Sequence, residues 1–166
     1  MLFTLTLALA LGAEPQKITS ETTPKPHPLA PSLPELTEAQ EKKIDGIIDR
    51  FIEADTGQLK GPEAKQAMDD FKNLGPEAFF ALVRGLNKAA LINHSCPAVV
   101  IARKLNTQLR SSEDTELLQY ARENIGAGVK GSKHGDVLRD LRVISSMRQN
   151  ALKNQPRPTI IGGPSK

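Results

Sequence analysis

Apolar residues recur at three- and four-residue spacing along the middle of the chain, from residue 37 to residue 153. This periodicity constrains the fold more than any other feature, because residues at that spacing line up on one side of a helix. The first run contains five such residues, namely Ile44, Ile47, Ile48, Phe51 and Ile52. A half-buried strand would instead show apolar residues at every second position, and the middle of the chain contains no run of that kind. The middle of the chain is therefore predicted to be all-α.

Six helices are expected in this range, and glycine, proline and hydroxyl-bearing residues mark where they begin. Thr37 is expected to cap the first helix, with Gln40 completing a capping box. The later helices are expected to start at Gly61–Pro62, after Pro76, at Ser95 and Pro97, at Ser111 or Ser112, and at Asp136. Because the connections are short, consecutive helices are expected to pack as antiparallel neighbours.

The apolar positions also repeat from one helix pair to the next. Moving 38 residues along the chain places Ala67 on Leu105 and Phe71 on Leu109, and moving a further 36 places Leu105 on Leu141. A period of about 40 residues, with two helices in each unit, is typical of HEAT and armadillo arrays. The sequence therefore predicts a stack of helix pairs.

Residues 67–86 (AMDDFKNLGPEAFFALVRGL) resemble one HEAT-type unit. In such a unit the first helix ends in Leu-Gly, a turn carries Pro-Glu-Ala, and a second helix follows with paired apolar residues. The second unit departs from this pattern, since Leu109 is followed by Arg-Ser-Ser rather than by a Leu-Gly-Pro turn. The resemblance implies a short HEAT-like stack of about six antiparallel helices over residues 37–153. It also implies a scaffold or protein-binding role rather than catalysis.

The first 13 residues (MLFTLTLALALGA) have the character of a signal peptide. Their apolar run has the length of a signal-peptide core and is shorter than the roughly 20 residues that span a bilayer. Ala10 and Ala13 offer cleavage positions, although no lysine or arginine precedes the run. We therefore expect an exported protein, periplasmic or secreted, with no membrane span once the signal is removed. An uncleaved hydrophobic segment is the alternative.

Prolines crowd both ends of the chain. Residues 14–36 are rich in proline, threonine and serine and lack apolar periodicity, which predicts an extended linker. Residues 154–166 contain three more prolines and no apolar stripe, and they are predicted to be a disordered tail. The helical domain is thus expected to occupy residues 37–153 alone.

Basic residues concentrate toward the C-terminus. From Ala127 onward the chain carries eight lysines or arginines and two aspartates, a net charge of +6, against −3 for the rest of the chain. Five of them are expected to form a basic stripe at the end of the stack, with Gln149 beside them: Lys130, Lys133, Arg139, Arg142 and Lys153. A stripe of one sign favours an acidic protein partner. The alternative is a solubilising cap on the last repeat.

Cys96 is the only cysteine, which excludes a disulfide within the chain and a multi-cysteine metal site. It lies close to His94 at an expected helix start, where a histidine and the helix dipole can turn a thiol into a nucleophile. The favoured interpretation is instead a small apolar residue packed under the helix start. A thiol-dependent enzyme or redox-sensitive protein that uses Cys96 with His94 remains the alternative function.

Other functional signatures are weak. The glycines of the segment 126–131 match the spacing of a dinucleotide-binding loop, but a helix rather than a strand is expected before them. The histidines lack metal-binding spacing, and no aromatic residues interleave with the basic ones as they do in nucleic-acid-binding surfaces. We therefore expect no metal, no cofactor and no nucleic-acid partner. The favoured function is an exported protein-interaction module.

Overall fold

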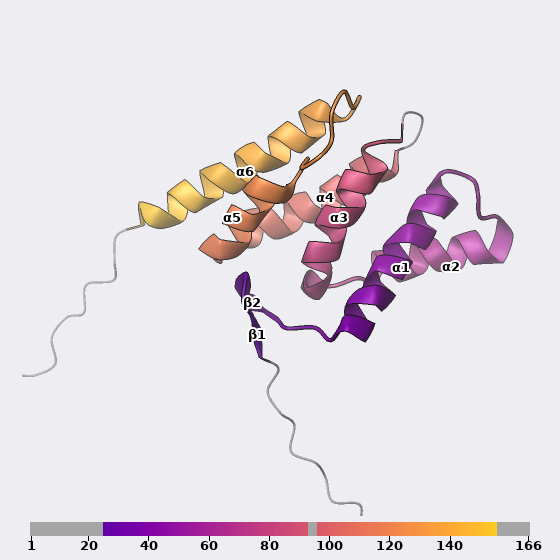
Figure 1. The fold of residues 1–166 in the computed structure, drawn as a ribbon, viewed down its shortest axis with the longest axis horizontal. Coiled ribbons are helices and arrows are strands. Elements are labelled where there is room, and N and C mark those ends of the chain that lie inside the picture. Colours follow the sequence, from indigo (N-terminus) through magenta and orange to yellow (C-terminus); the bar gives the residue numbers. More distant parts are fainter. Residues whose placement is uncertain (1–24, 93–95, 156–166) are drawn as a thin grey trace, which may run out of the picture.

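The computed structural model describes residues 25–92 and 96–155, which form six α-helices, one 3-10 turn and a two-stranded hairpin (Figure 1). The hairpin comes first, with strands β1 (Pro26–His27) and β2 (Ala30–Pro34). The helices follow in the order α1 (Glu38–Asp55), α2 (Gly61–Lys72), α3 (Phe79–Ala89), α4 (Pro97–Ser111), α5 (Thr115–Asn124) and α6 (Gly135–Lys153), and the 3-10 turn η1 (Pro76–Ala78) precedes α3. The prediction of six helices is confirmed. The expected signal peptide, the linker residues before 25 and the tail after 155 lie outside the described residues.

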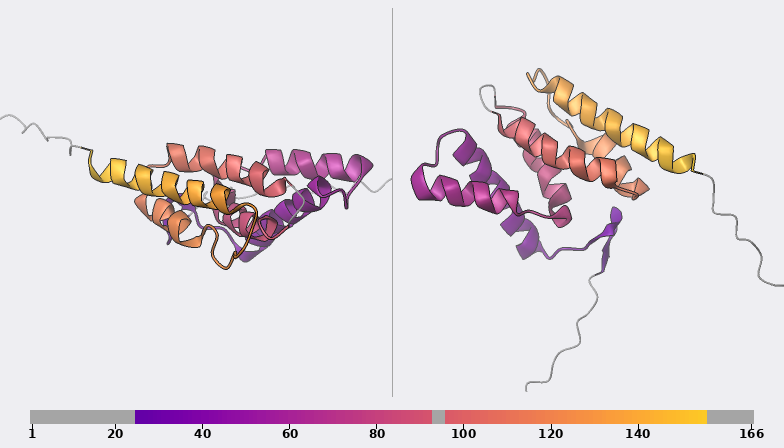
Figure 2. Two further views of the ribbon diagram at one scale, coloured as in Figure 1. Left: turned by 90° about the horizontal axis from the view of Figure 1, so that it is seen from above. Right: turned by 180° about the vertical axis from the view of Figure 1, so that it is seen from behind.

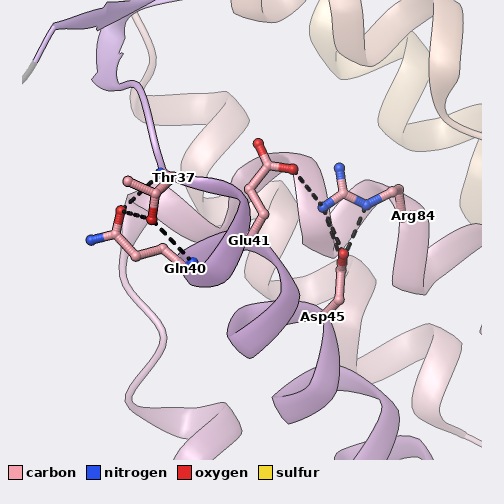
Figure 3. A network of polar contacts seen from close by, with 5 residues as sticks. All are labelled: Thr37, Gln40, Glu41, Asp45 and Arg84. Atoms are coloured by element: carbon pink, nitrogen blue, oxygen red, sulfur yellow. Dashed lines mark hydrogen bonds and ion pairs between the residues drawn. The ribbon is translucent and has the colours of Figure 1, made fainter.

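Two helix starts follow the signals in the sequence. The Thr37 hydroxyl accepts a hydrogen bond from the backbone N–H of Gln40, and the Gln40 side chain accepts one from the Thr37 backbone N–H at 2.9 Å (Figure 3). This capping box satisfies two N–H groups that have no partner inside α1. Helix α2 has Pro62 in its first turn, where the missing N–H costs nothing.

The start of α5 differs from the expected one. Its N-cap is Asp114, whose Oδ1 accepts hydrogen bonds at 3.0 Å from the backbone N–H groups of Glu116 and Leu117. Neither Ser111 nor Ser112 is the cap. A carboxylate interacts with the positive end of the helix dipole as well as with the free N–H groups, and Asp114 therefore takes the position predicted for a serine.

The helices pack as three consecutive pairs, α1 with α2, α3 with α4 and α5 with α6. Neighbouring pairs meet mainly where α1 contacts α3 and where α4 contacts α6. Helices α2, α4 and α6 lie side by side in one layer, and α1, α3 and α5 lie in the other (Figure 2). The predicted stack of helix pairs is confirmed. Helix α6 lies at one end of this stack, so one of its sides faces away from the other helices (Figure 1).

The hydrophobic core lies between the two layers. Its largest fully buried side chains come from α1, α3, α4 and α5 and include Phe51, Phe79, Leu82, Leu105 and Leu118. Gly85 on α3 allows a close approach to α1, since a Cβ atom there would lie 2.4 Å from Cγ2 of Ile48. The contact between α1 and α3 therefore depends on the absence of a side chain at residue 85.

The prediction of a linker over residues 14–36 is wrong for its last part. Residues 26–34 form the hairpin, in which Ala30 and Leu33 are buried and the backbone N–H of Ser32 donates to Oδ2 of Asp114 at 2.9 Å. The His27 ring also stacks on Phe80 with 4.1 Å between ring centroids. Prolines exclude a helix here, but they leave the backbone extended. An extended segment needs only a few well-placed apolar residues to pack on an existing core.

Candidate interaction surface

The five basic residues predicted to form one stripe are all exposed, but they do not lie together. Lys130 and Lys133 belong to the loop before α6, Arg139 and Arg142 lie in its first half, and Lys153 is its last residue. Lys153 follows Arg142 by 11 residues, which is about 16 Å along a helix axis. The basic residues therefore gather near the start of α6, and Lys153 stands apart from them.

Gln149 was expected beside this stripe, and that expectation is wrong. Its residue is only 5% exposed, and its Nε2 donates to the backbone oxygen of Thr115, the first residue of α5, at 3.1 Å. Seven residues complete two turns of a helix to within about 20°. Arg142, seven residues before Gln149, therefore lies toward the same side of α6 as Gln149, at the edge that faces α5. Periodicity alone does not separate a buried amide from an exposed one.

The charge at the start of α6 is less uniform than the sequence indicated. Arg139 pairs with Asp136 of the same helix, with 3.0 Å between Nη2 and Oδ1. Within the described part of the chain, Lys130, Lys133 and Arg142 form no ion pair. Exposed pairs within one helix contribute little to stability. These cations are therefore not needed to hold α6 in place.

Two apolar side chains that the sequence analysis did not single out lie exposed on α6. Val143 is 48% exposed and Met147 is 66% exposed, and the two stand four residues apart on one side of the helix. Arg139 precedes Val143 by the same spacing. We name these residues, together with Arg142, the α6 surface: Arg139, Arg142, Val143 and Met147. An end helix normally presents a polar face to solvent, and the i, i+4 spacing outside the buried stripe is the signal that would have revealed this surface.

Cys96 is exposed, so the prediction that it packs under the helix start is wrong. It is the N-cap residue of α4 and makes no side-chain capping bond. The buried stripe of this helix begins one residue later, at Pro97 and Ala98, which leaves the preceding turn at the surface. His94 and Ser95 lie outside the described residues, so the proposed pairing of Cys96 with His94 is not placed by the structure.

The glycines of the segment 126–131 serve as turn residues. Gly126, Gly128 and Gly131 have φ values of 79°, 75° and 65°, in the left-handed region that favours glycine. The segment follows helix α5 rather than a strand, and the Ser132 hydroxyl ties it to the body by donating to the backbone oxygen of Ala90. The described residues thus lack the strand–loop–helix order of a dinucleotide site.

No family model, no curated protein and no solved structure matches this chain. The structure shows a small, mostly helical protein whose six helices are packed in pairs. Over residues 25–92 and 96–155, no group of three or more histidine, cysteine or acidic side chains is arranged to hold a metal ion. None of the helices in that part of the chain is long and apolar enough to cross a membrane.

Proposed function

We propose that the chain is an exported protein-interaction module with a HEAT-like stack of helix pairs, and that it binds a protein partner without catalysis or a cofactor. The observation that carries this proposal is the pair of exposed apolar side chains on the α6 surface, Val143 and Met147. An exposed apolar pair on an otherwise polar end helix is destabilising to leave in water and favourable to cover. Apolar side chains bordered by charged ones are typical of protein-binding sites.

The chemistry of the α6 surface defines the kind of partner. Arg139 borders the apolar pair, and Arg142, Lys130 and Lys133 lie at the same end of α6. These four basic residues outnumber the two exposed aspartates of that end, Asp136 and Asp140, which share the side of the apolar pair. The partner segment is therefore acidic, with apolar residues at its centre. An amphipathic helix fits these requirements, because it presents apolar residues at the same four-residue spacing as Val143 and Met147. Such a helix would lie against α6 as a further helix of the stack.

The HEAT-like description rests on the pairing of helices and on the repeat of apolar positions. Asn87 of α3 links the second helix pair to the third: its Nδ2 donates to the backbone oxygen of Asn124, and its Oδ1 accepts from the N–H of Gly126. Side chains that join one helix pair to the next in this way are expected in a helical array. Arrays of this kind present surfaces to other proteins, which supports binding rather than chemistry.

Replacing both Val143 and Met147 with serine tests the proposal. Each side chain that becomes buried on binding contributes about 1–2 kcal/mol, so each loss weakens the affinity by about tenfold. We expect the double variant to lose capture of the partner from a native envelope extract, with unchanged helical circular dichroism. Met68→Ser on α2, another exposed apolar position, is the matched control. Equal capture by the parent and the double variant would refute the proposed surface.

A further inference from the structure

A second exposed surface lies in the layer of α1, α3 and α5, where the hairpin packs on α5 (Figure 1). Here a groove of about 240 Å³, which we name the α5 groove, is lined by two residues of the hairpin turn and four residues of α5: Pro28, Leu29, Glu116, Gln119, Tyr120 and Glu123. Leu29 is 52% exposed although it is a large apolar residue. The α5 groove therefore combines an apolar and aromatic lining with two carboxylates.

Tyr120 gives the α5 groove an aromatic wall that is fixed by the core. Its ring packs edge-on against Phe80, with 4.7 Å between ring centroids, and the His27 ring stacks on Phe80 in turn. Tyr120 is half-buried, so packing sets the position of the ring while part of it lines the groove. A side chain that is already held in place loses little conformational entropy when a partner covers it.

The two carboxylates give the α5 groove a negative charge. Glu116 and Glu123 are seven residues apart, so they lie on nearly the same side of α5 and about 10 Å apart along its axis. Glu123 accepts a hydrogen bond from Gln119 and lies 3.8 Å from Arg122. Glu116 forms no ion pair with any described residue. The negative charge is therefore least compensated at Glu116.

The α6 surface carries the opposite charge beside an apolar pair of its own. Val143 and Met147 are exposed there, one helical turn apart. Four cations and two carboxylates lie at the start of α6 and in the loop before it, which gives a net charge of +2: Lys130, Lys133, Arg139, Arg142, Asp136 and Asp140. Surfaces of opposite charge attract one another and align as they bind. The α6 surface and the α5 groove are thus complementary in charge and in apolar content.

We propose, on the basis of the binding role proposed for the α6 surface, that its partner is a second copy of this chain, which receives that surface in its α5 groove. When Val143 of one copy lies against Tyr120 of the second copy, Arg139 and Glu116 each lie four residues earlier, about 6 Å along their helix axes. The two helices therefore run in the same direction, and Arg139 meets Glu116. A guanidinium has five N–H donors, so Arg139 binds Glu116 while it keeps Asp136 of its own helix.

Met147 is the second apolar contact. It is 66% exposed on α6, and it follows Val143 on the side of the helix that meets the groove. A methionine side chain is unbranched and flexible, fits irregular apolar grooves and makes favourable contacts with aromatic rings. Leu29 and the ring of Tyr120 provide such a lining.

The geometry of this contact determines the kind of assembly. The two surfaces are different, so each copy that binds through one of them keeps the other free, and the contact repeats from copy to copy. The assembly therefore grows as an open chain and does not stop at a dimer. Because the contact is small, we expect weak association, measurable between about 10 µM and about 1 mM protein.

Sedimentation equilibrium of the purified protein tests the proposal. The weight-average mass of the parent should rise steadily with concentration and exceed that of a dimer. The first variant, Val143→Ser with Met147→Ser, removes the apolar pair of α6, and the second, Leu29→Ser with Glu116→Gln, alters the α5 groove. Each should weaken the association at least tenfold, whereas Met68→Ser on α2 should associate like the parent. All the proteins have the same ends, and circular dichroism checks that the variants keep their helices.

Mixing the two variants is the decisive step. The first keeps an intact α5 groove and the second an intact α6 surface, so an equimolar mixture should form one heterodimer and nothing larger. Association of the second variant at the parent's level would overturn the proposal, because the contact would then not use the α5 groove. A parent that stays monomeric at 1 mM, or a mixture that forms no heterodimer, would also overturn it.

The binding role of the α6 surface is tested separately by capture from the envelope extract. If the parent is monomeric but the first variant still loses capture of a different protein, the second copy is the wrong partner and the α6 surface remains a binding site. If that capture is also unchanged, both proposals fail.

Discussion

Exposed basic residues lie in two places, at the contact between α1 and α3 and on the outer side of α6. They differ in whether they pair with a carboxylate of another helix. At the first, Arg84 donates to both carboxylate oxygens of Asp45, with Nη2 at 3.0 Å from each (Figure 3). In the same contact, Nζ of Lys88 lies 2.6 Å from Oδ1 of Asp49. On α6, Arg139 pairs only within its own helix and Arg142 has no partner among the described residues. Charges paired between helices favour one packing arrangement, whereas the charges of Arg139 and Arg142 join α6 to no other described helix.

The same contrast holds for apolar residues. Gly85 and Ile48 bring α1 and α3 so close that no side chain fits between them. Val143 and Met147 on α6 have no such neighbour and remain exposed. A tightly packed contact tolerates little change, whereas an exposed surface tolerates substitution with little loss of stability. We therefore expect substitutions on the α6 surface to leave the fold intact.

Gly85→Val is expected to have the largest effect on stability. Its Cβ would overlap Ile48, and overpacking of this kind costs about 2–3 kcal/mol. Gly46→Val on α1 is the matched control, because a Cβ there meets nothing within 4 Å. Urea unfolding followed by circular dichroism measures both variants. Equal stability of the two variants would mean that α1 and α3 are not in close contact.

Asp114→Ala is expected to cost about 1 kcal/mol, the usual effect of removing a helix N-cap. It also removes the hydrogen bond from Ser32 that holds the hairpin. Burial works to raise the pKa of Asp114, but hydrogen bonds from the backbone N–H groups of Leu117, Ser32 and Glu116 outweigh it and hold the pKa below its ordinary value.

Because the pKa of Asp114 is lower in the folded state than in the unfolded state, its stabilising contribution is present above the ordinary aspartate pKa of about 3.9 and is lost as pH falls through the folded value. Urea unfolding measures the free energy of unfolding of the parent and the Asp114→Ala variant at neutral and at acidic pH. The difference between the two proteins should become smaller at acidic pH. A difference that stays constant with pH would show that the carboxylate charge plays no part.

Cys96→Ser is expected to have the smallest effect. An exposed residue without a capping bond contributes little, so stability should change by less than about 0.5 kcal/mol. The thiol of the parent should react with a maleimide reagent as fast in the native state as after denaturation, because it is exposed. Capture of the partner by the variant should equal that of the parent. Slow native labelling, or loss of capture, would revive the thiol-based alternative.

The helical fold was predictable because local signals and apolar periodicity agree along the chain. The capping box of Thr37, Pro62 in the first turn of α2 and Gly126 after α5 all lie where the sequence indicated. The hairpin was not predictable in this way. Its two buried residues, Ala30 and Leu33, lie among prolines and show no period. The hairpin is held by contacts with residues far away in the sequence, such as the hydrogen bond from Ser32 to Asp114.

The surface was harder to predict than the fold. Periodicity identified Arg139 and Arg142 as exposed, but it also placed Gln149 beside them. The residue type favoured a buried Cys96, which is exposed. Whether a polar residue is buried depends on whether a neighbouring backbone group can accept its hydrogen bond, as Thr115 does for Gln149. Whether such an acceptor is nearby depends on the tertiary structure and cannot be derived from the spacing of residues along one helix. This is also why the exposed pair of Val143 and Met147 emerged only from the structure.

Charge reversal on α6 tests most directly whether its basic residues serve binding rather than folding. The double variant Arg139→Glu, Arg142→Glu is compared with Lys65→Glu, Lys72→Glu on α2, which changes the net charge equally at other exposed positions. The melting temperature of both should stay near that of the parent, since exposed charges contribute little. Capture from the envelope extract should fall severalfold for the α6 variant alone, most strongly at low salt, where charges are least screened. Capture equal to that of the parent at both low and high salt would contradict a binding role for the α6 surface.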